Sequence, residues 1–150
     1  MPSSYTCLHY HLVFSTKNRE PMIHSAWQDQ MFAYIGGILR GEEGCLLAAG
    51  CMPDHVHLLV GISKRMAVAD ALRIIKSKSS KWVHETIPAC SEFAWQEGYG
   101  AFTVSYSSLD AVREYLANQA EHHRVRTFQE EFLAMLERHG IPYDPRYIWE

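Results

Sequence analysis

The sequence predicts an α+β fold in which two helices cover one face of an antiparallel sheet. Three observations predict it: short segments with apolar residues at alternate positions, longer segments with apolar residues at helical spacing, and the order of these segments. Of the 150 residues, 47% are hydrophobic and 12% aromatic, which is enough for a buried core. We expect one domain over residues 1–150, with a core at about 5–124 and a helical extension at about 125–150.

The first half of the core contains four expected elements. Residues 5–14 are apolar at every second position, which predicts a strand. From Ser25, a candidate N-cap, to Gly41, apolar residues recur every three or four positions, which predicts a helix. Residues 45–52 and 55–62 are short apolar runs separated only by a Pro-Asp pair, which indicates two strands joined by a tight turn.

A second helix and a fourth strand complete the core. Apolar residues from Val68 to Val83 fall on one arc of a helix, and basic residues occupy the remaining arc. Residues 101–106 alternate again and predict a strand. The resulting order, strand, helix, strand, strand, helix, strand, is that of a ferredoxin-like domain with both helices on one face of the sheet.

Two more helices are expected after this core. One covers 107–124 and begins with Ser107 as part of a capping pair. The other covers 127–140, where Thr127 and Glu130 have the spacing of a capping box and a glycine ends the helix. The chain therefore carries helices beyond the ferredoxin-like core.

Charge and hydropathy restrict the classes of function. The net charge of -3 argues against a protein that coats nucleic acid without selectivity. No run approaches ~20 apolar residues and no signal peptide opens the chain, so we expect a cytoplasmic protein without a membrane partner. Between Lys64 and Lys81, however, six basic residues accompany one acidic residue. This segment is either a solvated helix face or a surface for phosphates.

Two histidines stand on one face of the strand expected at 55–62. Side chains two residues apart on a strand point the same way, so His55 and His57 present their imidazoles side by side. Such a pair is half of a metal or phosphate site, or else two hydrogen-bonded strand residues. His9 and His11 repeat the spacing in the first strand, and for them we retain a structural interpretation.

A third ligand is expected from the helix over 107–124. Tyr115 and Gln119 lie four residues apart and share a face, with His122 about one turn further along. An ordinary boundary tyrosine beside a solvent-facing glutamine would show the same spacing.

Together these residues resemble the single-tyrosine HUH transposases of small insertion sequences and their REP-associated relatives. The resemblance rests on His55 and His57 within "MPDHVHLLV" and on Tyr115 and Gln119 within "VREYLANQ". The segments "YHLVFSTKNREP" and "RIIKSKSSKWV" also resemble that family, so the similarity covers most of residues 5–124.

The resemblance implies a homodimeric enzyme that cuts single-stranded DNA at hairpin ends, with active sites often shared between subunits. Tyr115 would attack a phosphodiester and leave a 5′-phosphotyrosine link and a free 3′-hydroxyl. His55, His57 and Gln119 would hold one divalent cation, Mg²⁺ or Mn²⁺. The proton acceptor for the phenol is not identified, and Asp54 and His122 are candidates.

Basic residues would contact the phosphates of the DNA hairpin. The candidates are Lys17, Arg19, Arg73, Lys76, Lys78 and Lys81.

The alternative function is a non-catalytic or domesticated nucleic-acid-binding module on the same fold, in which the metal site is idle. A purely structural interaction protein would leave the basic segment without a role. A histidine-triad hydrolase would need a third histidine at Leu59, and a zinc deaminase would need His-x-Glu and Cys-x-x-Cys, which the chain lacks.

Overall fold

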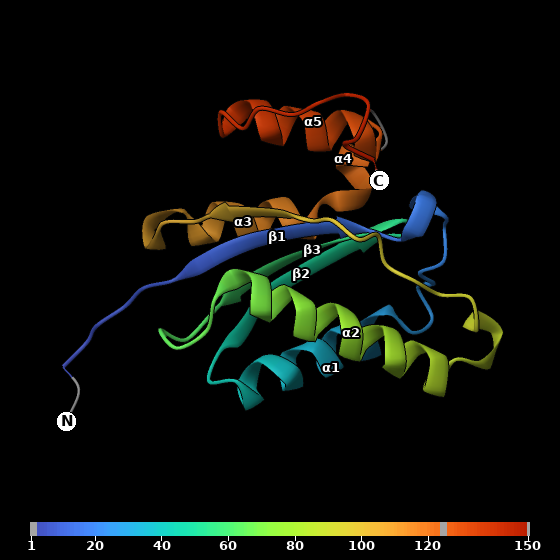
Figure 1. Cartoon of the computed structure of the whole chain (residues 1–150), viewed down its shortest axis with the longest axis horizontal. Helices are drawn as coiled ribbons and strands as arrows, with labels where there is room; N and C mark the ends of the chain where they lie inside the picture. Colours follow the sequence, from blue (N-terminus) through green and yellow to red (C-terminus); the bar gives the residue numbers. More distant parts are fainter. Residues whose placement is uncertain (1–2, 124–125, 150) are drawn as a thin grey trace.

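The chain folds around a four-stranded antiparallel sheet, shown in the computed structural model of Figure 1, which describes residues 3–123 and 126–149. The strands are β1 (His9–Ser15), β2 (Cys45–Met52), β3 (His55–Gly61) and β4 (Gly100–Thr103). Their order across the sheet is β2-β3-β1-β4, with β1 and β3 in the middle. This order confirms the predicted α+β, ferredoxin-like class.

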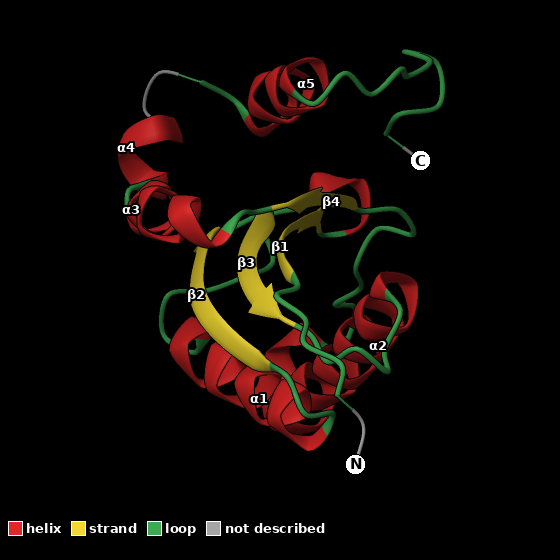
Figure 2. Cartoon of the chain, turned by 90° about the vertical axis from the view of Figure 1, so that its left-hand side faces the viewer, coloured by secondary structure: helices red, strands yellow, loops and turns green. Residues whose placement is uncertain are grey.

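Helices cover both faces of the sheet (Figures 1 and 2). One face carries α1 (Gln28–Gly41) and α2 (Val68–Thr86), and the other carries α3 (Leu109–Ala117), α4 (Gln119–His123) and α5 (Phe128–Arg138). Short 3-10 helices are η1 (Lys17–Arg19), η2 (Pro88–Cys90) and η3 (Tyr106–Ser108). Within the described part of the chain, no helix combines the length and apolar character needed to cross a membrane.

Strand alternation assigns different chemistry to the two faces. Leu12, Phe14 and Leu58 point toward α1 and α2, where they join the largest apolar core. Their neighbours His11 and His57 are buried on the other face, where His57 contacts Glu131 of α5 and His11 contacts His57. The first face therefore supplies apolar burial, and the second combines apolar packing with buried polar groups.

Several element boundaries differ from the sequence prediction. β1 begins at His9, because its partner β3 ends opposite at Gly61. β4 ends at Thr103, where its pairing with β1 stops at Tyr10. α1 begins at Gln28, so the predicted N-cap Ser25 lies in a turn before it.

The expected helix over 107–124 is two helices. Asn118 leaves helical geometry, with φ -105° and ψ 27°, and its N–H bonds to the Tyr115 carbonyl in a tightened last turn. α4 follows at once and turns the chain toward α5. Ser107 does not cap α3, whose N-cap is Ser108 without a side-chain capping bond. The predicted end, Arg124, lies outside the described residues.

The capping box of α5 is confirmed. The Thr127 hydroxyl accepts a hydrogen bond from the Glu130 N–H at 3.2 Å, so the helix begins at Phe128. Its apolar side packs on the sheet through Val13 and Phe102. The cap thus sets which α5 residues face the sheet.

Candidate active site

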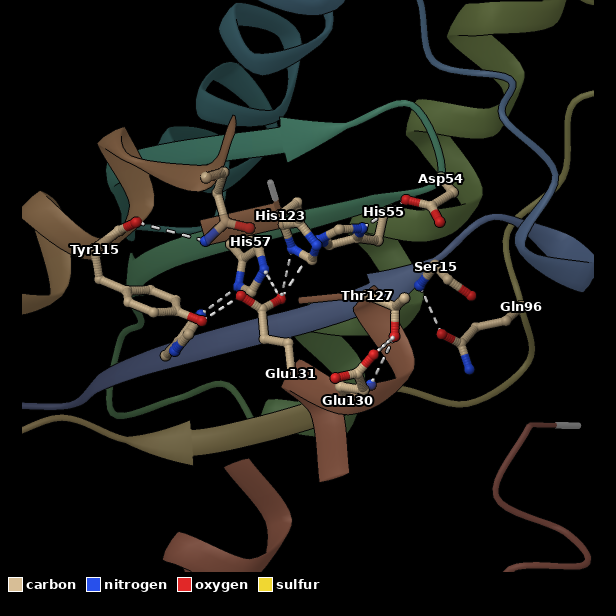
Figure 3. Close-up of polar contacts among 12 residues, drawn as sticks. Ser15, Asp54, His55, His57, Gln96, Tyr115, His123, Thr127, Glu130 and Glu131 are labelled. Atoms are coloured by element: carbon tan, nitrogen blue, oxygen red, sulfur yellow. Dashed lines mark hydrogen bonds and ion pairs between the residues drawn. The ribbon is translucent and has the colours of Figure 1, made fainter. Parts of the chain in front are cut away.

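A buried cluster of three imidazoles and one carboxylate lies where β3, α4 and α5 meet (Figure 3). It consists of His55, His57, His123 and Glu131, and we call it the His–Glu cluster. One carboxylate oxygen of Glu131 lies 2.9 Å from His57 Nε2, 3.1 Å from His123 Nε2 and 3.5 Å from His55 Nε2. The four groups offer ligand atoms within 4.8 Å of one another. Such a set can enclose a single cation.

Two residues outside the cluster, Asp54 and His11, orient His55 and His57. Asp54 lies 2.7 Å from His55 Nδ1, and His11 Nε2 lies 2.8 Å from His57 Nδ1. Since an ionised Asp54 only accepts, His55 donates through Nδ1 and turns Nε2 toward the cluster. That Nε2 atom is buried and has no hydrogen-bond partner among the described residues. When the ring is neutral, this atom carries the lone pair that a metal ligand provides.

Burial and charge set the protonation of the cluster. Although burial opposes its charge, the adjacent His55 ring and the hydrogen bond from His57 hold the pKa of Glu131 far below its usual range. Burial and the neighbouring His57 lower the pKa of His11 to about 3, and burial also lowers the pKa of His57. Both of these rings are therefore neutral.

His55 behaves differently because two carboxylates flank it. Burial favours its neutral form, but the hydrogen bond to Asp54 and the nearby Glu131 carboxylate raise the pKa of His55 above its usual value. The pair of carboxylates thus favours a positive charge at this point, which a bound cation would also supply.

Tyr115 reaches the cluster from α3. Its phenol donates a hydrogen bond to the second carboxylate oxygen of Glu131. Burial and the adjacent carboxylate raise the pKa of Tyr115 well above its usual range, so the phenol is neutral and donates. The Tyr115 ring also stacks on His122, with ring centres 4.4 Å apart.

A glycine allows α3 to approach this closely. Gly50 of β2 pairs with His57, and a Cβ atom there would collide with the carbonyl oxygen of Leu116. The missing side chain brings α3 against the sheet beside the strand histidines.

Gln119 lies at the start of α4 and is buried. Its Nε2 is 3.5 Å from the Tyr115 carbonyl oxygen, and its buried Oε1 has no hydrogen-bond partner among the described residues. A free, buried amide oxygen suits a hard cation. Its predicted role as a metal ligand stays a prediction.

The predicted proton acceptors are not the groups nearest the phenol. Asp54 contacts His55, and His122 lies against the face of the Tyr115 ring. The phenol of Tyr115 donates its hydrogen bond to Glu131 instead.

Sequence reasoning missed His123 and Glu131. His11 is a buried ring hydrogen-bonded to His57 and is not among the four groups of the cluster, so its structural interpretation stays a prediction. A signal for Glu131 exists, since it interrupts the apolar stripe of α5 that includes Phe128 and Phe132. An acid on the core face of a helix indicates a buried partner.

The six basic candidates do not converge on Tyr115. Arg73, Lys76, Lys78 and Lys81 lie on α2, across the sheet from α3 (Figure 1). Lys17 and Arg19 lie in η1, where the Arg19 guanidinium sits 5.3 Å from the Trp149 ring centre. DNA that contacts α2 would therefore meet a different face from the candidate active site.

Lys76 has a structural role. Its ammonium donates to the carbonyl oxygens of residues 96, 97 and 98 at 2.5, 3.0 and 2.9 Å and lies 5.4 Å from the Phe14 ring centre. These contacts tie the 96–98 loop to α2 and leave no donor for DNA.

On a ferredoxin-like sheet, this protein therefore combines a candidate metal site, the buried His–Glu cluster, with a candidate nucleophile, Tyr115. Residues 4–119 match the family described as "Transposase IS200 like". The chain belongs to this family of transposases.

Two relatives illustrate the similarity. The ISDra2 transposase TnpA of Deinococcus radiodurans is 25% identical over 117 residues, which cover 75% of this chain and 84% of the relative. The transposase for insertion sequence element IS200 of Salmonella typhimurium is 26% identical over 118 residues, covering 75% of this chain and 76% of the relative.

Two solved structures share the fold. A crystal structure described as that of a Deinococcus radiodurans R1 transposase aligns with a TM-score of 0.66 and 25% identity, covering 79% of this chain and 95% of that one. A REP-associated tyrosine transposase bound to a REP hairpin aligns with a TM-score of 0.60 and 15% identity, covering 82% and 73%.

The Lys76 contacts predict a stability effect. Lys76→Met keeps the aliphatic stem but removes three charged hydrogen bonds, so it should lower the free energy of unfolding by about 2 kcal/mol. Lys78→Met, at an exposed position two residues along, should change it by less than ~0.5 kcal/mol. Urea denaturation measures both, and equal losses would contradict the structural role.

The cluster predicts metal binding that depends on Glu131. Glu131→Gln removes the only carboxylate of the His–Glu cluster, so the Kd for Mn²⁺ should rise by more than ~100-fold, beyond the effect typical of residues outside the ligand set. Glu137→Gln, exposed on the same helix, should leave the Kd unchanged. Isothermal titration calorimetry compares them, and a Kd for Glu131→Gln within threefold of wild type would exclude Glu131 as a ligand.

Proposed function

We propose that this protein cleaves and rejoins single-stranded DNA at hairpin ends through a covalent 5′-phosphotyrosine at Tyr115. One observation carries the proposal: the Tyr115 phenol donates to the same carboxylate that faces His55 and His57. A candidate nucleophile and candidate metal ligands thus meet at one point, in a chain of the IS200-like family.

The metal ligands we propose are His55, His57 and Gln119, joined by His123 and Glu131 of the cluster. The resident cation would be Mn²⁺ or Mg²⁺, and imidazole donors favour Mn²⁺. Such a cation would neutralise charge on the scissile phosphate and orient it.

The chain's own groups account for the transfer. The Tyr115 oxygen attacks phosphorus, the bond from phosphorus to the 3′ oxygen breaks, and the departing 3′ oxygen takes up a proton as a hydroxyl. Glu131 orients the phenol through the hydrogen bond that it accepts, and a cation bound at the cluster would help the phenol lose its proton to solvent. The phosphotyrosine retains the energy of the phosphodiester, so the reverse reaction rejoins strands without ATP.

The proposed substrate follows from the family and from the relative solved with a REP hairpin. We propose that Lys17, Arg19, Arg73, Lys78 and Lys81 contact hairpin phosphates, and we leave Lys76 out of this set. Residues 1–150 would act as one cytoplasmic domain, in which α5 forms part of the site.

We further propose a homodimer in which each active site forms within one chain. α3 packs on β2 and β3 of its own chain, where Leu116 and Leu59 belong to one buried apolar cluster. This arrangement argues against a tyrosine supplied by the partner subunit.

The nucleophile has a direct test. Wild-type protein incubated with labelled single-stranded hairpins from the gene's flanks and Mn²⁺ should form an adduct that survives denaturing electrophoresis. Tyr115→Phe should abolish the adduct and keep DNA binding, because only the oxygen that bonds to phosphorus is lost. Tyr106→Phe, at an exposed tyrosine, is the control. Binding without an adduct from any flank or metal would favour the nucleic-acid-binding module.

Mixing variants tests how the site is assembled. Tyr115→Phe and His57→Ala proteins, mixed after light scattering has established the dimer, should form no adduct, because each chain lacks one part of its own site. A mixture of wild type and His57→Ala should retain activity in proportion to the wild type. Recovery of adduct in the first mixture would show a shared site.

A further inference from the structure

A cleft of about 560 Å³ opens beside Tyr115, between β4, α3 and α5. It is not part of the His–Glu cluster, although Tyr115 belongs to its wall. The residues that line it include His11, Phe102, Val112, Met135, Arg138 and His139. Whatever occupies this cleft would lie directly next to the proposed nucleophile.

The cleft walls suit a planar heterocycle. Phe102 and Met135 are buried and supply apolar surface, and the Phe102 ring stacks on His139 with ring centres 4.5 Å apart. Hydroxyl groups of Ser105 and Ser108 stand on the exposed side of the cleft. Apolar and aromatic walls with a few polar groups at the rim match a nucleobase, which has apolar faces and a polar edge.

The Arg138 side chain brings a positive charge to the same cleft. Arg138, at the end of α5, is exposed and has no ion pair or side-chain hydrogen bond with other described residues. Arg138 and Tyr115 line the same cleft. An unpaired guanidinium next to a phosphodiester nucleophile is suited to a phosphate oxygen.

We infer that this cleft binds the nucleotide adjoining the scissile phosphate, with its base against Phe102 and Met135 and its phosphate on Arg138. The inference rests on the proposed function for the identity of the ligand as single-stranded DNA. Charge complementarity and the position of Tyr115 favour this occupant. The α5 side of the cleft lies beyond residues 4–119, so Met135, Arg138 and His139 would add contacts from sequence outside the family match.

Photocrosslinking locates the base without requiring cleavage. Tyr115→Phe protein is mixed with single-stranded 20-mers from the gene's flanks that carry 5-iododeoxyuridine at single positions. Irradiation should crosslink one nucleotide position to Phe102, Met135 or His139, as mapped by mass spectrometry. Crosslinks confined to residues outside the cleft would overturn the inference.

Matched variants then measure the contribution of the cleft. In the Tyr115→Phe background, Ala111→Trp should fill the cleft and Arg138→Gln should remove its cation, each raising the Kd for the 20-mers about tenfold. Ala117→Trp on the same helix and Arg146→Gln near the C-terminus, both exposed and outside the cleft, should leave the Kd within twofold. Equal affinities across these four variants would also overturn the inference.

The two proposals fail in different ways. An adduct in wild type without a crosslink in the cleft would retain the nuclease and reject the subsite. A crosslink in the cleft without any adduct would retain the subsite and reject the nuclease.

Discussion

The buried carboxylate of Glu131 is the constraint on which the candidate site depends. An ionised carboxylate is tolerated in a protein interior only when hydrogen bonds or cations surround it. Here His57 comes from β3, Tyr115 from α3 and His123 from α4, while α5 carries the acid itself. Four elements are therefore held together by one charge, and the same contacts bring a candidate nucleophile next to candidate metal ligands.

The two faces of the sheet have different roles: one forms the apolar core that stabilises the fold, and the other carries the candidate site. Under α1 and α2, strand residues such as Leu12 and Leu58 form an apolar core that needs no polar partner. On the other face, His55 and His57 replace apolar residues, and Gly50 lets α3 approach them. The apolar face supplies burial that stabilises the sheet, so the second face can hold buried polar groups.

The C-terminal helices are part of the site. The family match ends at residue 119, whereas His123 and Glu131 lie beyond it. Arg138 at the end of α5 also stands beside the cleft next to Tyr115. The extension therefore contributes to both the candidate metal centre and the proposed nucleotide subsite, instead of covering the sheet passively.

The sequence by itself determined features that depend on local periodicity. The strand period placed His55 and His57 on one face, and the capping-box spacing located the start of α5 at Phe128. Only the tertiary structure decided that Glu131 meets His57, 74 residues away, and that Lys76 binds a loop and not phosphate. The physical reason is that local spacing sets the direction of a side chain, whereas its partners depend on how distant elements pack.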